Sequence, residues 1–330
     1  MSAPDLRTAI REALAEELER DAAVVLLGGC GEDPGGALGY LRERFGPERV
    51  LGAPSSGLAL AGAAYGAAVA GLRPVFELAS ADLITLAMDG LVNRAAKFWH
   101  VSGGQGTVPL VARAAVGAGC RRGAIDSQSP CSWLQGVPGL KIAFPSSPAE
   151  ARGLLKGAIR DDNPVVFLEH RRLRFARSAK GPVPEPDGEA IPLGGARVAR
   201  AGRDLTIVSA GGSVSDALDA ADLLAGDGVD AEVLDLRTLR PLDLEAVLES
   251  VARTNRLLAV EEGPRLGGWA AGLLGLVAER ALHDLDDAWT LTMAELPIPY
   301  SPTLEDALLA DAGSIVAGVR ARLGLAPGVG

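Results

Sequence analysis

The sequence predicts an α/β protein of two domains, each a largely parallel sheet with helices on both faces. Short aliphatic and β-branched runs alternate with helical stretches of about 10–15 residues, the order typical of parallel sheets. The 330 residues exceed one ordinary domain, and 48% of them are apolar, so each half can bury a core. This periodicity is lost across Arg174–Pro192, which holds four prolines. We therefore expect domains at 1–175 and 193–330, with a linker at 176–192.

The first domain opens with an amphipathic helix, because Leu6, Ile10 and Leu14 recur at helical spacing. Ser147 and Glu150 form a capping box with Pro148 at the first helical position, so a second helix begins there and runs toward Arg160. Strands are expected in the first domain at Val24–Leu27, Val108–Arg113, Lys141–Phe144 and Pro164–Glu169, and in the second at Leu205–Ser209, Ala231–Leu236, Arg256–Glu261 and Thr290–Met293.

Composition excludes several classes of protein. The formal charge of −10 argues against a nucleic-acid partner, which needs a basic face. The longest apolar helix candidate, Leu58–Leu72, is too short to span a membrane and is rich in alanine and glycine, so we expect a tightly packed helix and no membrane partner. The three cysteines are too few for a disulfide scaffold, and no signal-peptide pattern is present, which favours a cytoplasmic location.

Generic motifs do not identify a chemistry. No phosphate-loop motif is present, and Gly117-Ala118-Gly119 lacks the third glycine of a dinucleotide-binding turn. The three histidines are dispersed, which makes them improbable metal ligands. The basic stretch His170–Arg174, with Arg177, has two interpretations: a solvated edge, or a docking patch for an acidic partner.

Seven segments together resemble one family, the beta subunit of the decarboxylase component of 2-oxo acid dehydrogenases of the pyruvate and branched-chain types, which is related to the C-terminal two-thirds of transketolase. These segments follow one another at the family's spacing over nearly the whole chain. They are Ala70–Leu78, Asn93–Gly104, Pro138–Ile142, Ala158–Glu169, Arg237–Asp243, Val260–Gly268 and Leu296–Asp306.

The resemblance implies a pyrimidine-binding thiamin diphosphate domain followed by a transketolase C-terminal domain. It also implies an α2β2 heterotetramer, in which the alpha partner holds the diphosphate and its Mg²⁺ and the beta subunit holds the aminopyrimidine ring. Self-association to a beta pair is part of this assembly, and we expect the helix Leu58–Leu72 to contribute to that contact. The acceptor of the reaction product would be a lipoyl domain, a carrier-protein domain or a sugar.

The family's reactive positions are changed in this sequence. The glutamate that shares a proton with the aminopyrimidine ring falls at Gly57, within Pro54–Gly62. The aromatic residue against the ring falls at Leu83, and the histidine of a QHSQ-like segment falls at Asp126. Paired acids after the first strand are replaced by Gly28-Gly29-Cys30. Glycine cannot exchange a proton, so the beta subunit's own relay is missing at that position.

Three hypotheses account for these changes. The chain is an active subunit whose relay comes from its partner or from water, a catalytically silent subunit that holds or regulates an alpha partner, or a chain misaligned in one loop. An ionised Asp126 would repel a 2-oxo acid, whereas a buried neutral Asp126 could donate a hydrogen bond. An uncharged ketose or aldehyde would be less affected than pyruvate.

A monovalent cation site is also implied by the resemblance. In this family K⁺ is held by oxygens around an AIRDNNP-like loop, which here reads AIRDDNP. The implied ligand residues are Leu110, Ala158, Ile159, Asp161 and Asn163. The alternative is an ordinary helix-to-strand turn, in which Asp161 and Asn163 act as turn formers.

Overall fold

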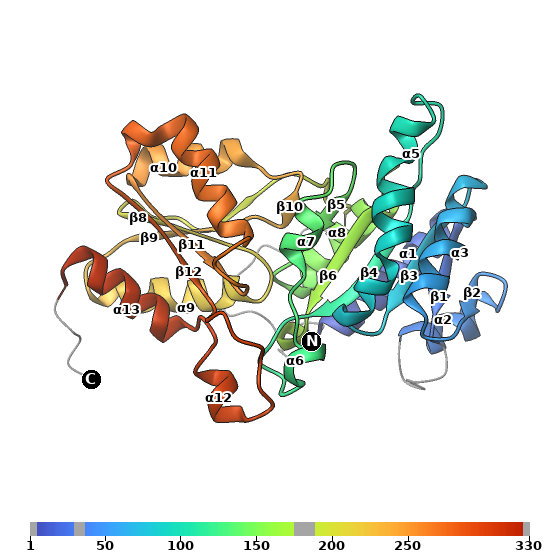
Figure 1. Cartoon of the computed structure of the whole chain (residues 1–330), viewed down its shortest axis with the longest axis horizontal. Helices are drawn as coiled ribbons and strands as arrows, with labels where there is room; N and C mark the ends of the chain where they lie inside the picture. The colour runs from blue at the N-terminus through green and yellow to red at the C-terminus, as the bar shows by residue number, and fades with distance from the viewer. Residues whose placement is uncertain (1–4, 30–36, 175–188, 326–330) are drawn as a thin grey trace.

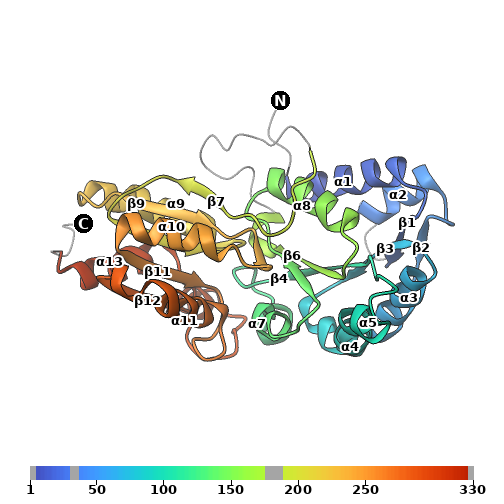
Figure 2. The same ribbon diagram turned by 90° about the horizontal axis from the view of Figure 1, so that it is seen from above.

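A computed structural model describes residues 5–29, 37–174 and 189–325. Two sheets lie side by side, one in each half of the chain, and helices cover both faces of each sheet (Figures 1 and 2). This confirms the predicted fold class. Residues 176–188 of the expected linker lie outside the described ranges.

The first sheet has seven strands in the order β10-β5-β6-β4-β3-β1-β2. The strands β1 to β6 pair in parallel, whereas β10, which comes from the second half, pairs antiparallel with β5 at one edge. The bounds are β1 Val24–Gly28, β2 Val50–Gly52, β3 Arg73–Leu78, β4 Val111–Val116, β5 Lys141–Ala143, β6 Val165–His170 and β10 Thr238–Arg240. Strands β1, β4 and β6 are buried throughout, as expected of a parallel sheet covered on both faces.

Helices α1, α2 and α8 cover one face of this sheet, and α3, α4, α5 and α7 cover the other (Figure 2). The predicted helix start is confirmed, because Ser147 Oγ accepts the backbone N–H of Glu150 at 3.3 Å where α8 begins. The Glu150 carboxylate contacts Ser146 and Arg237 instead of completing the capping box. The bounds are α1 Leu6–Arg20, α2 Ala37–Phe45, α3 Gly57–Val69, α4 Ile84–Met88, α5 Ala96–Val101, α6 Gly123–Asp126, α7 Cys131–Gln135 and α8 Pro148–Arg160. Two short turns complete this half: the 3₁₀ turn η1, Ala81–Leu83, and the π-helical segment η2, Asp89–Ala95, which joins α4 to α5.

Helix α3 is the Ala/Gly-rich segment that the sequence singled out, and only one side of it is buried. A Cβ added to Gly90 of η2 would lie 2.7 Å from Ala61 Cβ, so the two helices approach at backbone distance. Ala64 is fully buried in the same contact region. On the opposite side, Leu58, Gly62 and Gly66 are exposed, which leaves an apolar face without charged groups.

The second sheet has five strands in the order β12-β11-β8-β9-β7, all parallel except β7, which pairs antiparallel with β9. Helices α10 and α11 cover one face, and α9 and α13 cover the other (Figure 1). The bounds are β7 Arg197–Arg200, β8 Leu205–Ser209, β9 Ala231–Asp235, β11 Arg256–Glu261, β12 Asp287–Thr292, α9 Ser213–Gly226, α10 Leu244–Thr254, α11 Trp269–Ala281, α12 Pro302–Asp306 and α13 Ala312–Leu323. A 3₁₀ turn at Leu282–Asp284 follows α11, and another, η3 at Arg171–Arg174, follows β6.

Two expected strands are displaced. The strand expected at Val108–Arg113 lies at Val111–Val116, because Pro109 has no N–H for a sheet ladder. The strand expected at Thr290–Met293 begins three residues earlier, since β12 is an edge strand with a mixed, half-exposed sequence. Each of the other expected strands overlaps an observed strand to within a residue at either end.

A buried acid pair connects the halves where β9 ends against α8. Ser146 Oγ lies 2.8 Å from Glu150 Oε2 and 2.5 Å from Asp235 Oδ2. One hydroxyl proton cannot serve two carboxylates, so the cluster needs a second proton. Burial, followed by the charge of Glu150, raises the pKa of Asp235 well above its usual value. Burial opposes ionisation of Glu150 too, but the hydrogen bond from Asp235 and the charges of Arg197 and Arg237 lower its pKa. Of the two carboxyls, Asp235 is therefore the one that keeps a proton more readily.

Asp235→Asn should remove the need for this proton. A raised folded-state pKa stabilises the fold below the unfolded-state pKa, and that stability is lost as the pH rises through the folded-state value. As the pH rises above the ordinary aspartate pKa of about 3.9, the unfolding free energy of the wild type should therefore fall relative to that of Asp235→Asn, as measured by urea denaturation. Asp227→Asn is the control, because Arg320 lowers the pKa of Asp227 and its contribution is lost on acidification. Parallel pH profiles for Asp235→Asn and the wild type would contradict the shared proton.

Candidate active site

The three sequence-predicted positions Gly57, Leu83 and Asp126 lie together past the carboxyl ends of the parallel strands, where open α/β sheets bind ligands. Gly57 is the first residue of α3, whose cap is Ser56. A Cβ added to Gly57 would lie 2.5 Å from the Leu83 carbonyl oxygen and 3.2 Å from Leu86 Cβ. The backbone of η1 and α4 therefore fills the space that a side chain at position 57 would need.

Asp126 closes the other side of this group at the end of α6. Ser80 Oγ donates to Asp126 Oδ1 at 3.4 Å, and Arg122 pairs with Oδ2 at 3.4 Å. The Asp126 side chain is 35% exposed, so it is not buried. Cationic neighbours offset its charge, which weakens the expected repulsion of a 2-oxo acid.

Arg171 ties the two segments together from the end of β6. Its Nη2 donates to Ser80 Oγ at 2.8 Å, and its Nε donates to the Asp126 carbonyl at 3.1 Å. Arg172, beside it, pairs bidentately with Asp216 of α9. The interpretation of this basic stretch as a solvated edge or a docking patch is thus wrong for both arginines, because they make internal contacts; the side chains of Arg174 and Arg177 lie outside the described residues.

Two buried carboxylates from the second domain hold the loop that leads from β4 to α6. Glu262 Oε1 accepts the Ala118 N–H at 2.8 Å. Glu305 of α12 accepts the N–H groups of Gly119 at 2.8 Å and Arg121 at 3.0 Å, and it pairs with the Arg121 guanidinium at 2.7 Å. Figure 1 shows α12 lying against α6. The position of Asp126 therefore depends on the second domain.

Glu262 also binds His170 inside the domain junction. Arg172 donates its backbone N–H to His170 Nδ1 at 3.2 Å, which places the imidazole proton on Nε2, 2.9 Å from Glu262 Oε2. Burial would raise the pKa of Glu262, but His170, Arg172 and the Ala118 N–H together lower it. Glu262 is thus a fixed anion that anchors the loop.

A cavity of about 660 Å³ opens beside this junction, between the α6–α7 region and two loops of the second domain. Trp133, Met293 and Leu296 supply apolar walls, and Ser127, Gln128 and Glu262 supply polar groups. The volume is within the range of small-molecule sites. Within the described ranges, no cluster of three or more His, Cys, Asp or Glu side chains could hold a metal ion, and no helix is long and apolar enough to cross a membrane.

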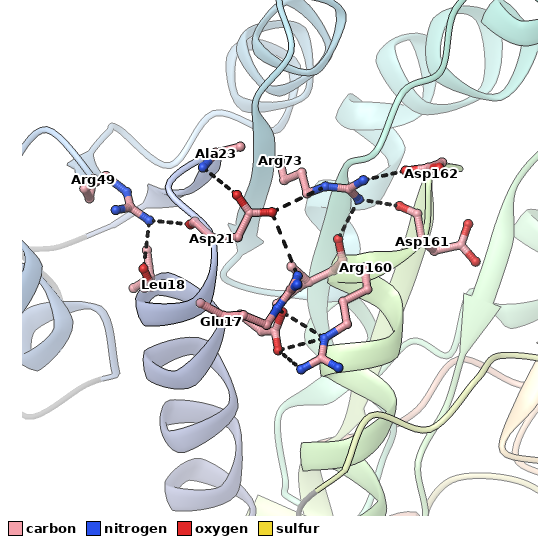
Figure 3. Close-up of polar contacts among 11 residues, drawn as sticks. Glu17, Leu18, Asp21, Ala23, Arg49, Arg73, Arg160, Asp161 and Asp162 are labelled. Atoms are coloured by element: carbon pink, nitrogen blue, oxygen red, sulfur yellow. Dashed lines mark hydrogen bonds and ion pairs between the residues drawn. The ribbon is translucent and has the colours of Figure 1, made fainter.

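The implied cation loop lies at the opposite end of the strands, where β3, β4 and β6 begin. Two basic side chains, Arg73 and Lys141, already bind this loop. Arg73 Nη1 donates to the carbonyls of Ile159 at 3.0 Å and Asp161 at 3.1 Å, and its guanidinium also pairs with Asp162 (Figure 3). Lys141 pairs with the Asp161 carboxylate. Of the other implied ligand residues, Leu110 and Ala158 use their carbonyls in backbone hydrogen bonds, and Asn163 donates to Asp161 Oδ1. Each carbonyl keeps a second lone pair.

Sequence reasoning missed Ser80, Arg171 and Glu305. Ser80 precedes Leu83 by three residues, and its place after β3 was a usable signal. The basic character of Arg171 was noticed but assigned to the surface. Nothing in the local sequence of Glu305 indicates that it crosses to the first domain, since that contact joins residues 184 or more positions apart.

Comparisons with known proteins show which family the two halves of the chain match. The family model for the transketolase pyrimidine-binding domain matches residues 2–175, and that for the transketolase C-terminal domain matches residues 194–315. The chain is 41% identical to the beta subunit of acetoin:2,6-dichlorophenolindophenol oxidoreductase of Cupriavidus necator, covering 96% of each protein. It is 39% identical to the 2-oxoisovalerate dehydrogenase subunit beta of Bacillus subtilis, covering 97% of this chain and 98% of that one.

A solved structure has the same fold. A split-gene transketolase chain, described as an inactive beta4 tetramer, superposes with a TM-score of 0.81 over 98% of this chain and 99% of that chain, at 22% identity. The likeness extends across both sheets.

Gly57→Glu should destabilise the fold, because the new side chain would meet the Leu83 carbonyl and bury a carboxylate. We expect a loss of roughly 3–5 kcal/mol in the free energy of unfolding, measured by denaturant titration. Gly272→Glu, at an exposed glycine of helix α11 with nothing within 4 Å, should change stability by less than about 1 kcal/mol. Equal stability of the two variants would show that position 57 has room for an acid.

Proposed function

Because the chain belongs to the family built from transketolase pyrimidine-binding and C-terminal domains, as do the beta subunits of 2-oxo acid dehydrogenases, we propose that it works with an alpha subunit as the beta-type subunit of a thiamin diphosphate-dependent enzyme. The reaction would decarboxylate a 2-oxo acid, or cleave an uncharged ketone or ketose, and pass the fragment to an acceptor. The observation that carries this proposal is the match of both domains, over nearly the whole chain, to relatives named as beta subunits.

The proposed fit to thiamin diphosphate differs between the diphosphate end and the aminopyrimidine end of the cofactor. In this proposal the diphosphate and Mg²⁺ belong to the alpha partner, and the carboxyl edge of the first sheet faces the aminopyrimidine ring. Leu83 offers an apolar contact to a ring face. Position 57 does not fit the proton exchange that the resemblance assigns to it, since it has neither a carboxylate nor space for one.

The missing acid at position 57 favours a second candidate function, a catalytically silent beta-type subunit that holds or regulates an alpha partner. The chain retains both domains and the contacts at their junction, which assembly with an alpha subunit requires, although it lacks the acid at position 57. The split-gene transketolase chain offers a parallel, because its beta4 tetramer is described as inactive. This candidate predicts assembly without turnover.

Assembly in this proposal is an α2β2 heterotetramer with a beta pair at its centre. The exposed apolar side of α3, with Leu58, Gly62 and Gly66, supports a contact between helices at that pair, since exposed apolar faces mark interfaces. A lipoyl or carrier-protein domain is the proposed acceptor partner. The acidic charge balance supports a protein partner over nucleic acid, and we retain the cytoplasmic location.

Co-expression with the alpha partner separates the two candidates. An active subunit should give a heterotetramer that turns over at least one of three substrates: pyruvate, 2-oxoisovalerate or acetoin. Loss of one general acid–base group lowers rates by about 10²–10⁴-fold, so slow turnover is expected. A heterotetramer that forms no product from any of the three would support the silent subunit. Failure to form any complex with an alpha partner would contradict both candidates.

We also propose K⁺ as a structural ion at the loop of Ala158–Asn163, with Leu110, on the second lone pairs of the carbonyls. The thermal midpoint should then be higher in potassium chloride than in choline chloride of equal ionic strength. Arg73→Gln should enlarge this difference, because it frees the carbonyls of Ile159 and Asp161. Arg49→Gln is the control: Arg49 also binds carbonyls, those of Leu18, Asp21 and Val24, but outside the loop (Figure 3). Equal midpoints in both salts for the wild type and Arg73→Gln would contradict the ion.

A further inference from the structure

The cavity beside the domain junction, which we call the junction cavity, is separate from the positions that the proposed function uses. It has a volume of about 660 Å³ and lies between the α6–α7 region of the first domain and two loops of the second, at residues 263–267 and 293–298. Gly57, Leu83 and Asp126 are not among its described lining residues. Its shape and lining therefore need an explanation of their own.

The wall that the second domain supplies is held by contacts between its two loops. The Met293 N–H donates to the Gly263 carbonyl at 3.1 Å, and the Leu266 N–H donates to Glu295 Oε1 at 3.3 Å. All four of these residues line the junction cavity. The two loops thus form one wall, facing a second wall that belongs to the first domain, so a molecule bound between them would contact both domains.

Two polar side chains of the first-domain wall already use donors inside the protein. Ser132 Oγ donates its proton to Glu261 Oε1 at 3.3 Å, and it keeps lone pairs as an acceptor. Gln128 uses its amide nitrogen for the Ile125 carbonyl at 2.9 Å, which leaves its Oε1 as an acceptor. These two side chains therefore suit a ligand that brings its own hydrogen-bond donors.

The charge of the lining favours a cation. Glu262 and Glu295 line the cavity, and none of its described lining residues is Lys, Arg or His. Glu262 is fixed by His170, whereas Glu295 is exposed and forms no ion pair within the described ranges; its one contact there is with the Leu266 N–H. Arg265 belongs to the same loop but does not line the cavity. A phosphate or a 2-oxo acid would meet like charge in this space.

The apolar part of the lining is open to water in the isolated chain. Trp133 is 50% exposed, Leu296 63% and Leu266 78%. An indole ring attracts an ammonium group to its face, and exposed aliphatic side chains gain from covering by an apolar body. The volume is that of a small-molecule site, and the pattern of apolar walls with few polar groups is typical of one.

We propose that the junction cavity binds a small apolar cation, a primary ammonium group carried on an aromatic or branched aliphatic body. The body packs on Trp133 and Leu296. The ammonium group donates to the acceptors of Gln128 and Ser132, in the field of the carboxylates that line the cavity. Because its walls come from both domains, an occupant joins them and stabilises their junction.

Three probes with the same phenyl body and different charges test this assignment on the full chain: 2-phenylethylammonium, 2-phenylethanol and phenylacetate. In calorimetric titrations the ammonium ion should bind about tenfold or more tightly than phenylacetate, with the alcohol between them, and added salt should reduce the difference. The ammonium ion should also raise the thermal midpoint. No binding of any probe up to millimolar concentrations, or equal binding of all three, would overturn the proposal.

Glu295→Gln separates the charge from the shape of the cavity, because glutamine keeps an oxygen for the Leu266 N–H. It should lower the preference for the ammonium ion over the alcohol about threefold. Glu279→Gln, at an exposed acid of α11 outside the cavity, is the matched control and should leave the preference unchanged. Trp133→Ala should weaken the ammonium ion and the alcohol together. Equal preferences in Glu295→Gln and Glu279→Gln would contradict the role of the carboxylate.

The same ammonium group could belong to a basic side chain of a protein partner, and one further titration distinguishes the two sources. The complex with the alpha partner should still bind 2-phenylethylammonium if the ligand is a small molecule. Loss of probe binding on assembly would assign the junction cavity to a side chain of that partner and overturn the proposal.

Discussion

Backbone contact between α3 and the segment that follows β3 determines the form of the candidate site. Gly57 lies against the Leu83 carbonyl, and further along α3 Ala61 lies against Gly90 of η2. The two segments of the chain therefore touch without intervening side chains. Such proximity requires small residues at Gly57, Ala61 and Gly90, which explains the alanine and glycine on the buried side of α3. It also closes position 57 to any acid.

The second domain completes this arrangement. Buried backbone N–H groups need acceptors, and the loop between β4 and α6 finds them in Glu262 and Glu305 across the junction. At another part of the same junction, Ser146 bridges Glu150 and Asp235, which couples the domains as well. The candidate site and the domain junction are thus held by the same contacts. The loop bound by Arg73 lies at the amino ends of the strands, away from the site, so we expect it to affect only stability.

The fold could be predicted well because buried parallel strands are short continuous apolar runs, and the helix at Ser147 has a complete capping signal. Predictions failed where residues distant in sequence determine the structure. The strand β10 pairs with a strand almost a hundred residues away, and Arg171 is buried where it donates hydrogen bonds to Ser80 and Asp126. The resemblance located Gly57, Leu83 and Asp126. It could not show that the space at position 57 is closed, since that depends on packing.

A structure of the heterotetramer with thiamin diphosphate bound would test the central claim, that backbone contact between α3 and η1 closes position 57 to any acid. The measurement is the distance from the Gly57 Cα to the Leu83 carbonyl oxygen, together with the group that lies nearest the aminopyrimidine ring nitrogen. We expect Gly57 still against the Leu83 carbonyl, with that ring nitrogen facing water or a group of the alpha partner. A segment Ala81–Leu83 withdrawn from Gly57, with room for a side chain at that position, would contradict the claim.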